Sequence, residues 1–339
     1  MRITSRAPLR IEFAGGGTDI PSYSDRHNGF VLNATINKYV YATLKPIHTS
    51  DVKFIKTETN ESLLFKDVKD LVYNGDSDLV KSVIKRMKIN YGGEIQLRSD
   101  VPPDTGLGNG ATTAVTLVGL FNTLRHEKKL SEYELAETAF ETMKYELDIQ
   151  GGKQSFYSSV FGGFNFIEFL ENGFTRVNRV RVRRQDVLEL EKNLLLIYIG
   201  KREKESGSQT ILRTQESLYE KNENALLLEK LKEIAWEMRD LLTRGDLPGF
   251  AQKMNETFET KKKLYPEITN KKIDDVCDLV KKHGAIATRI QGAGAGGHLI
   301  TYCEPNKEHT VAKALLEKGI TCIPFNFTER GLEVWEGED

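Results

Sequence analysis

The sequence predicts an α+β protein built from two domains. Its 339 residues exceed the usual length of a single domain, so two domains are the natural expectation. Short runs of alternating apolar residues, typical of strands, are interspersed with longer amphipathic runs typical of helices. Strands that alternate with helices on an apparently antiparallel sheet indicate an α+β sandwich.

The composition excludes several classes of partner. Hydrophobic residues make up 39% of the chain, charged residues 29%, and the formal net charge is −1. This balance provides no basic field that would attract nucleic acid or an acidic membrane surface. No apolar run approaches the roughly 20 residues that a membrane-spanning helix needs. A strand-like segment begins directly after Met1, so we expect no signal peptide and a cytoplasmic location.

Cysteine usage also favours a cytoplasmic protein, and histidine usage gives no indication of a metal site. The three cysteines, Cys277, Cys303 and Cys322, are dispersed in apolar segments, which predicts reduced core thiols. The six histidines show no ligand spacing, so we expect no structural metal site.

The first half of the chain predicts a strand-rich domain. Ile3, Leu9, Ile11 and Phe13 alternate with polar neighbours and predict a strand over residues 2–13. Further strands are expected at 30–47, 52–57, 94–98, 164–169 and 174–182, the last two joined by a hairpin turn at residues 172–173. Helices are expected at 78–87, 111–125 and 131–147, the last with a capping box of Ser131 and Glu134, and a short helix follows the break at residues 151–154.

A charged passage at residues 181–186 is the candidate boundary, giving domains of 1–185 and 186–339. A solvated surface turn is the alternative interpretation. The second domain is expected to begin with a strand at 194–199, followed by helices at about 206–243, 247–263 and 271–283. It is expected to end with strand 285–290, glycine loop 291–297, strand 298–303, helix 307–318 and strand 320–326.

A glycine-rich loop at residues 101–110 separates a predicted strand from a predicted helix. Such a loop leaves backbone N–H groups free at the positive end of the helix dipole, which is a suitable site for a phosphate. A tight turn with Asn109 as helix cap is the alternative. Two more glycine segments occur at residues 14–19 and 291–297.

These three glycine segments, in this order, resemble the GHMP kinase superfamily. Within it the sequence is most similar to the sugar 1-kinase branch, which includes heptose 7-phosphate kinases. The segments that carry the resemblance are 7–10 (APLR), 14–19 (AGGGTD), 31–36 (VLNATI), 151–154 (GGKQ), 161–169 (FGGFNFIEF) and 292–297 (GAGAGG). They span nearly the whole chain.

The resemblance implies an N-terminal domain like ribosomal protein S5 domain 2, a ferredoxin-like C-terminal domain and a substrate cleft between them. ATP phosphates would be held by Asp104, Thr105, Gly106, Leu107, Gly108, Asn109, Gly110 and Ala111, supported by Gly294. The sugar would be bound by Arg10, Gly16, Gly17, Thr18, Asp19, Lys153 and Gln154. An acid-bearing turn suits a polyol, because one carboxylate can accept hydrogen bonds from two hydroxyls. Arg202 and Lys261 or Lys262 could hold a sugar phosphate, with ordinary surface charge as the alternative.

The sequence departs from the family at the catalytic positions. Phosphoryl transfer needs charge neutralised on the γ-phosphate, usually by Mg²⁺, and a group that orients or deprotonates the attacking hydroxyl. The family supplies loop serines, a helix glutamate and an aspartate. These map here to Gly110 and Ala111, Met143, and Ser155, which Phe156 follows in place of the usual glutamine. Asp104 replaces a glycine and would repel phosphates, and Glu146 could substitute as a metal ligand.

Two hypotheses remain open. One is a kinase that uses ATP, with Mg²⁺ if active, to phosphorylate a sugar or sugar phosphate, at C1 of a heptose 7-phosphate or a related hexose. The other is a pseudokinase, a binding or regulatory protein that keeps the sugar cleft but has lost transfer chemistry. In both, the partner is a small sugar or sugar phosphate, and neither nucleic acid nor membrane is expected.

Overall fold

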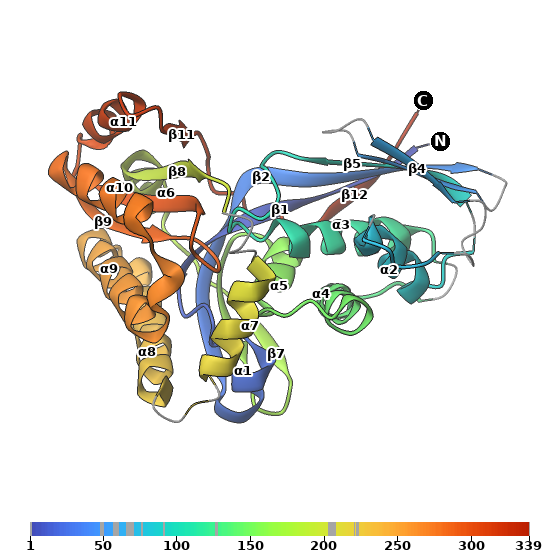
Figure 1. Ribbon diagram of the computed structural model, residues 1–339, viewed down its shortest axis with the longest axis horizontal. Coiled ribbons are helices and arrows are strands. Elements are labelled where there is room, and N and C mark those ends of the chain that lie inside the picture. The colour runs from blue at the N-terminus through green and yellow to red at the C-terminus, as the bar shows by residue number, and fades with distance from the viewer. Residues whose placement is uncertain are drawn as a thin grey trace.

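The computed structural model describes residues 2–47, 51–56, 61–65, 71–75, 77–90, 92–125, 128–202, 208–219, 221 and 224–338. The described chain forms two sheets with helices packed against each, which confirms the predicted α+β architecture. The sheets lie in two lobes, and the long strands β1 (Arg2–Ala14) and β2 (Gly29–Ile47) extend from the first lobe to the second (Figure 1).

The first sheet has eight strands in the order β12-β1-β2-β5-β3-β4, with β6 paired to β2 and β7 paired to β6. These other strands are β3 (Val52–Lys56), β4 (Glu61–Phe65), β5 (Gly92–Ser99), β6 (Phe164–Phe169), β7 (Thr175–Arg179) and β12 (Glu333–Gly337). Among the described strand pairs of this sheet, β3 and β5 run parallel and the rest are antiparallel. The antiparallel expectation therefore fails at that one pair.

Helices cover one face of the first sheet (Figure 1). They are α2 (Asp78–Arg86), α3 (Asn109–Thr123), α4 (Glu132–Glu141) and α5 (Gln154–Phe161). The largely apolar α3 packs against β1, β2, α4 and α5, and its buried side chains form the centre of the first core. The predicted capping box at Ser131 and Glu134 is confirmed. The predicted helix over 131–147 extends to residue 147, but its α-helical part ends at Glu141 and a π-helical segment, Thr142–Glu146, follows.

The second sheet contains β8 (Leu194–Gly200), β9 (Ala285–Ile290), β10 (Gly297–Cys303) and β11 (Thr321–Ile323) in the order β11-β8-β10-β9. Helices α7 (Ser208–Tyr219), α8 (Ala225–Arg244), α9 (Leu247–Leu264) and α10 (Lys271–Lys282) connect β8 to β9, and α11 (Glu308–Leu316) connects β10 to β11. Counted along the chain, these strands are antiparallel in the spatial order 4-1-3-2. This is the ferredoxin-like topology.

Successive side chains of β8 point to opposite faces of the second sheet, and both faces are buried. Leu196 lies in the core formed with α8, α9 and the ends of β1 and β2, whereas Ile197 lies in the core formed with α10 and α11. Cys303 is in the latter core, and burial raises the pKa of its thiol to about 12. All three cysteines are free, in agreement with the predicted reduced thiols.

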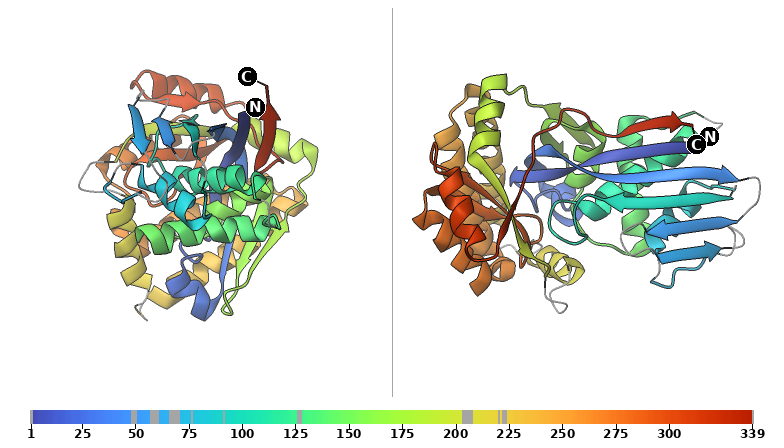
Figure 2. Two further views of the ribbon diagram at one scale, coloured as in Figure 1. Left: turned by 90° about the vertical axis from the view of Figure 1, so that its right-hand side faces the viewer. Right: turned by 90° about the horizontal axis from the view of Figure 1, so that it is seen from above.

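The last strand returns to the first lobe. β12 pairs antiparallel with β1, so the two ends of the described chain lie side by side (Figure 2). The predicted domain of residues 186–339 thus includes a strand of the first sheet, and the boundary at residue 185 stays a prediction. Neither α1 (Pro21–His27) nor α6 (Arg184–Asn193), which begins within the charged passage, was predicted. No helix in the described ranges is both long and apolar enough to cross a membrane.

Candidate functional site

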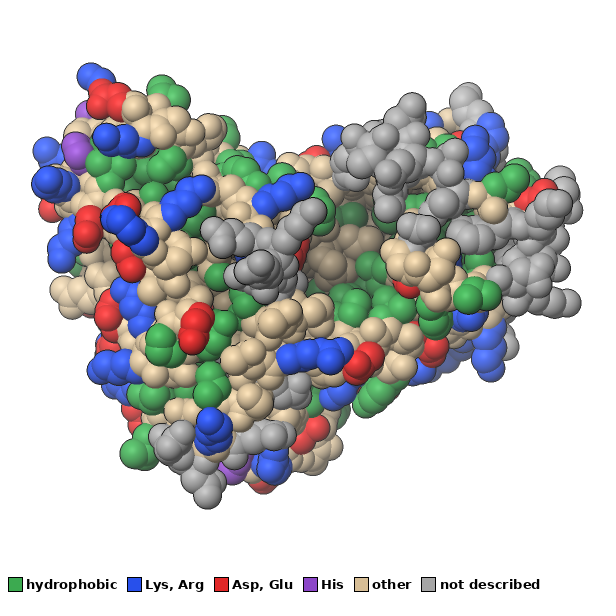
Figure 3. Space-filling view, in the orientation of Figure 1, with side chains coloured by type: hydrophobic (Ala, Val, Ile, Leu, Met, Phe, Trp, Pro, Cys, Tyr) green, Lys and Arg blue, Asp and Glu red, His purple; other side chains and the backbone are tan. Residues whose placement is uncertain are grey.

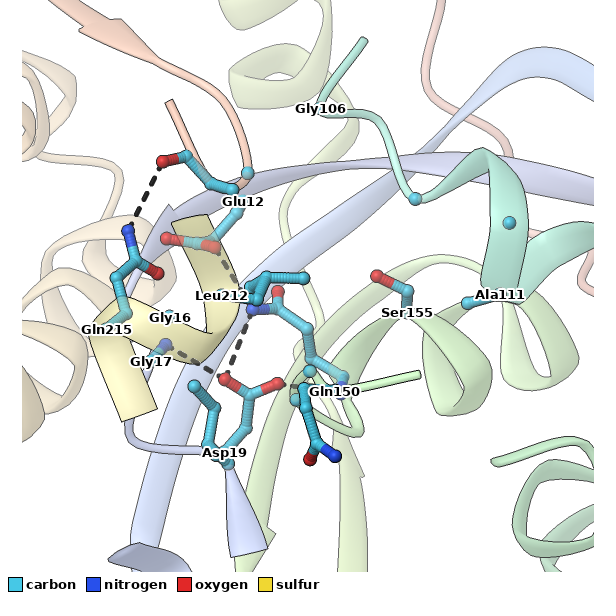
Figure 4. A pocket seen from close by; sticks show the side chains of 18 of the residues that line it. Glu12, Gly16, Gly17, Asp19, Gly106, Ala111, Gln150, Ser155, Leu212 and Gln215 are labelled. Carbon is cyan, nitrogen blue, oxygen red and sulfur yellow. Dashed lines mark hydrogen bonds between the residues drawn. The ribbon is translucent and has the colours of Figure 1, made fainter. Parts of the chain in front are cut away.

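A cleft of about 420 Å³ is lined by residues of both lobes, and the surface is hollowed between them (Figure 3). Its walls come from the end of β1 and the first glycine turn, the loop before α3, the start of α5, one side of α7, and the end of α9 with the last glycine segment (Figure 4). The predicted site residues that line it are Arg10, Gly16, Gly17, Asp19, Asp104, Thr105, Gly106, Gly108, Asn109, Gly110, Ala111, Met143, Gln154, Ser155, Arg202 and Lys261.

The loop before α3 leads into the helix through a left-handed glycine. Gly108 is the N-cap residue, with φ +83°, and Asn109 is the first helical residue. The alternative in which Asn109 caps the helix is therefore wrong; its side-chain amide instead donates to Ser99 Oγ at 2.5 Å. The first intrahelical hydrogen bond runs from Thr112 N to Gly108 O, which leaves the preceding N–H groups available for an anion.

The last glycine segment packs directly against this loop. A Cβ atom on Gly106 would lie 2.4 Å from Gln291 O, and one on Gly297 would lie 2.3 Å from Thr105 O. His298 also contacts Thr105 O through its backbone N at 3.1 Å and its Nδ1 at 2.9 Å. Glycines are required here because two backbones from different lobes are in contact. Leu107, the remaining member of the loop, is fully buried in the core.

Asp104 is compensated by Arg202. Asp104 has φ +61°, a left-handed conformation that suits the glycine of the family pattern and that Asp tolerates. Its Oδ1 accepts from Arg202 Nη1 at 3.1 Å, while Arg202 Nε donates to Gly294 O at 2.6 Å. Burial lowers the pKa of Arg202, and the Asp104 charge opposes that change. The expected repulsion of phosphates by Asp104 is thus partly offset by this ion pair.

The carboxylate of Asp19 closes the first glycine turn. Its Oδ1 accepts from Gly17 N and its Oδ2 from Gln154 N, both at 2.9 Å (Figure 4). Burial raises the pKa of this carboxyl. A Cβ atom on Gly152 would lie 2.0 Å from Asp19 Oδ2, so the glycine is needed beside the acid. Thr18 does not line the cleft; its hydroxyl donates to Gly15 O at 2.7 Å within the turn.

Arg10 and Ser155 flank Gly108. Arg10 Nη1 donates to Gly106 O at 2.7 Å, and its Cζ lies 3.6 Å from the position of a Cβ on Gly108. Ser155 Oγ lies 2.9 Å from the same position. Arg10 Nε has no acceptor among the described residues. The guanidinium and the hydroxyl are therefore placed where the loop before α3 meets the start of α5.

The residues that the resemblance assigns to the metal site do not fit Mg²⁺. Met143 Cε lies 3.6 Å from the Cβ position of Gly110, so the two positions adjoin, but neither supplies an oxygen ligand. Phe140 and Phe156, whose rings meet edge to face at 5.5 Å, and Ala111 complete an apolar wall. Mg²⁺ is bound by hard oxygen ligands, and no group of three or more His, Cys, Asp or Glu side chains in the described ranges could hold a metal ion.

Three predicted side chains are directed to other partners. Glu146, the possible substitute ligand, does not line the cleft and lies 3.3 Å from Tyr73 Oη and 3.9 Å from Arg86 Nη1. Lys153 also lies outside the lining and donates to Glu137 Oε1 at 2.8 Å. Lys262 donates to Glu259 at 2.9 Å, so of the two alternative lysines only Lys261 reaches the cleft.

The sequence reasoning missed several cleft residues. Glu12 is buried in β1 beside the cleft, and α7 contributes Gln209, Leu212 and Gln215. An acid between apolar neighbours in a predicted strand was a usable signal for Glu12. The α7 residues carried no comparable signal, because an amphipathic helix does not reveal from its sequence which element it covers.

Two family models match the chain, that of the GHMP kinases N-terminal domain over residues 78–163 and that of the GHMP kinases C-terminal domain over residues 238–321. The chain is also 31% identical, over 98% of both sequences, to the D-glycero-alpha-D-manno-heptose 7-phosphate kinase of Campylobacter jejuni. It belongs to the GHMP kinase family. The resemblance stated from the glycine segments is thereby confirmed.

Solved structures of sugar kinases share the whole fold. A D-glycero-D-manno-heptose 1-phosphate kinase from Bacteroides thetaiotaomicron has a TM-score of 0.80 at 28% identity, covering 99% of this chain and 100% of that one. A sugar kinase from Campylobacter jejuni has a TM-score of 0.80 at 31% identity, covering 98% of both. GHMP kinases use ATP, so the nucleotide expected for the present protein is ATP.

Proposed function

We propose that the cleft binds a sugar phosphate of the D-glycero-D-manno-heptose 7-phosphate class together with ATP, and that phosphoryl transfer to C1 is very slow. The observation that carries the second part is the apolar wall of Phe140, Met143 and Phe156 beside Gly110. The protein would then act as a ligand-binding or regulatory member of the family.

Binding is supported by the groups that face the cleft. The N-terminus of α3 offers free N–H groups for phosphates. Arg10 Nε is a buried donor without an acceptor in the described chain, and Asp19 and Gln154 provide acceptor oxygens for hydroxyls. Similarity to a heptose 7-phosphate kinase over 98% of both chains supports the sugar class.

Slow transfer follows from the chemistry of the step. The transition state spreads charge over the transferred phosphoryl group, and bound metal ions usually neutralise it. Here Gly110 and Met143 supply no metal ligand, and Ser155 replaces the expected aspartate beside Gly108. A neutral hydroxyl accepts a proton from a sugar far less readily than a carboxylate does.

A working kinase is the second candidate, and Arg10 is the observation that favours it. Its guanidinium lies beside Gly108 and would neutralise part of the phosphoryl charge without a protein-bound metal. Such an enzyme would phosphorylate the same sugar phosphate at C1 with rearranged catalytic groups.

Thermal shift and turnover separate the candidates. The heptose 7-phosphate and ATP should each raise Tm, and the ATP shift should be about the same with Mg²⁺ as with EDTA. A ligand at 100 times its Kd adds about 2.7 kcal/mol of stability, so the shifts are measurable. Sugar-dependent ADP release at roughly 1–100 s⁻¹, the usual kinase range, would instead establish the working kinase. Absence of any shift with the sugar phosphate would refute the binding proposal.

A further inference from the structure

A buried chain of polar contacts runs from the second lobe to the sugar end of the cleft. Lys261 Nζ on α9 and Arg289 Nη2 on β9 both donate to Glu12 Oε1, at 2.8 and 2.7 Å. The other oxygen, Glu12 Oε2, accepts from Gln154 Nε2 at 3.0 Å. All four residues are at most 7% exposed. The contacts join residues up to 277 positions apart in the chain.

The carboxylates fix the direction of the Gln154 amide. An ionised carboxylate only accepts hydrogen bonds, so the amide must present its NH₂ group to Glu12 and its oxygen to the other side. Asp19 Oδ1 lies 3.5 Å from the same nitrogen, so this second carboxylate also favours the NH₂ group on this side of the amide. Gln154 Oε1 is buried and has no hydrogen-bond partner within the described chain, although Gln154 lines the cleft.

A buried acceptor without a partner is costly unless a ligand supplies the donor. The side of the cleft formed by Gln154 and Asp19 offers oxygen atoms, which suits a ligand hydroxyl (Figure 4 shows the Glu12 and Asp19 carboxylates there). Glu12 itself has little such capacity left, because three of the roughly four acceptor sites on its two oxygens already receive donors.

We propose that Glu12 is a positioning residue: it holds the Gln154 amide so that Gln154 Oε1 accepts a hydrogen bond from a sugar hydroxyl. This inference rests on the proposed sugar-binding function. It gives the ion cluster of Glu12, Lys261 and Arg289 a role in ligand recognition beyond holding the two lobes together.

A double-mutant cycle tests the proposal with D-glycero-D-manno-heptose 7-phosphate as the probe. Glu12→Gln should weaken sugar affinity about tenfold, the value of one hydrogen bond of about 1.4 kcal/mol, and leave ATP affinity unchanged. In a Gln154→Ala background the same change should have almost no effect on sugar affinity, because the group through which it acts is gone. Equal losses in both backgrounds would overturn the proposal.

Two further variants separate positioning from charge and folding. Glu12→Asp keeps the negative charge for Lys261 and Arg289 but withdraws the carboxylate from Gln154. It should therefore weaken sugar affinity as Glu12→Gln does. It also replaces Glu12→Gln in the test if that variant does not fold. Glu333→Gln is the matched control, since Glu333 accepts from Arg6 and Arg330 in the first sheet, away from the cleft. It should leave sugar affinity unchanged, and a loss equal to that of Glu12→Gln would contradict the proposal.

A ligand-free measurement distinguishes failure of this inference from failure of the proposed function. Hydrogen exchange of the Gln154 side-chain amide, followed by NMR, should be slow in the wild type and clearly faster in Glu12→Asp. If the wild type binds no sugar, the proposed function fails, and with it the sugar contact. If the sugar binds but the amide exchanges equally fast in both proteins, the positioning role of Glu12 is refuted and the proposed function stands.

Discussion

Met143 Cε lies 3.6 Å from the position that a Cβ atom would occupy on Gly110. The resemblance to GHMP kinases predicts a metal-binding glutamate and serine at these two positions. The structure brings the two positions together, and neither residue has a side-chain oxygen atom. This pairing makes the effect of restoring them a direct test of function.

Restoring the missing groups should raise transfer activity. The triple change Gly110→Ser, Met143→Glu and Ser155→Asp should increase sugar-dependent ADP formation by about a hundredfold or more, the range of a general base, in the presence of Mg²⁺. Gly110 has space, because the Met143 contact at its Cβ position is an ordinary van der Waals distance. A coupled assay with heptose 7-phosphate measures the rate.

Single reversions should have little effect, since groups that act as one unit are strongly non-additive. Glu146→Gln is the control, because Glu146 lies outside the cleft lining. Strong Mg²⁺-dependent turnover in the wild type, unchanged by altering Gly110, Met143 and Ser155, would show that other side chains perform the chemistry.

Asp19→Ala should abolish detectable sugar binding. A hydrogen bond to a charged group contributes roughly 1.5–3 kcal/mol, so two lost bonds weaken affinity by orders of magnitude. From sequence alone the change should leave Tm nearly unaltered, but the structure adds a stability cost. Asp19 also accepts from Gly17 N and Gln154 N, so its removal leaves buried donors unpaired. Calorimetry and thermal unfolding measure both effects. Asp25→Ala, at an exposed site on α1, is the control and should change neither sugar affinity nor Tm. An unaltered sugar Kd in Asp19→Ala would show that Asp19 serves only to shape the turn.

Asp104→Gly should tighten ATP binding by about fivefold, because removing a like charge near the phosphates is worth roughly 1 kcal/mol in a partly solvated site. The change also frees Arg202 from its ion pair. Glycine adopts the φ of +61° without strain, so stability should be little affected. In an Arg202→Gln background the gain should shrink, since the freed cation is then absent. Weaker ATP binding in Asp104→Gly would mean that the ion pair shapes the loop.

The stability effect of Glu12 should depend on pH. Burial alone would raise the pKa of the Glu12 carboxyl, but the charges of Lys261 and Arg289 outweigh it and hold the pKa well below 4.5. As the pH falls below 4.5, the unfolded chain takes up the proton first, so the stabilisation by Glu12 is present above that pH and declines below it. Urea unfolding of wild type and Glu12→Gln should show a difference of about 3–5 kcal/mol at neutral pH, as for a broken buried pair. The difference should shrink in acid. A pH-independent difference would contradict this assignment.

Local patterns were sufficient for much of the fold and for part of the site. Alternation of apolar residues located β1, and the Ser131 capping box located the start of α4. The glycine turns at 14–19, 106–108 and 292–297 were predicted from their glycines, and Gly15, Gly106 and Gly292 lie too close to other backbone atoms to carry a side chain. The strand and the cap depend on neighbours in sequence, and the glycine segments are recognisable from their residue types and order, so the family could be predicted without the tertiary structure.

The tertiary structure alone decided which distant residues share the cleft. Glu12 contacts Lys261 and Arg289 only because β1, α9 and β9 meet between the lobes, and no local pattern encodes such a meeting. The same holds for the position of α7 beside the cleft and for the return of β12 to β1. Asp104 looked like an uncompensated charge until the fold brought Arg202 to 3.1 Å from it. Electrostatic compensation depends on distance in space, which separation along the chain does not reveal.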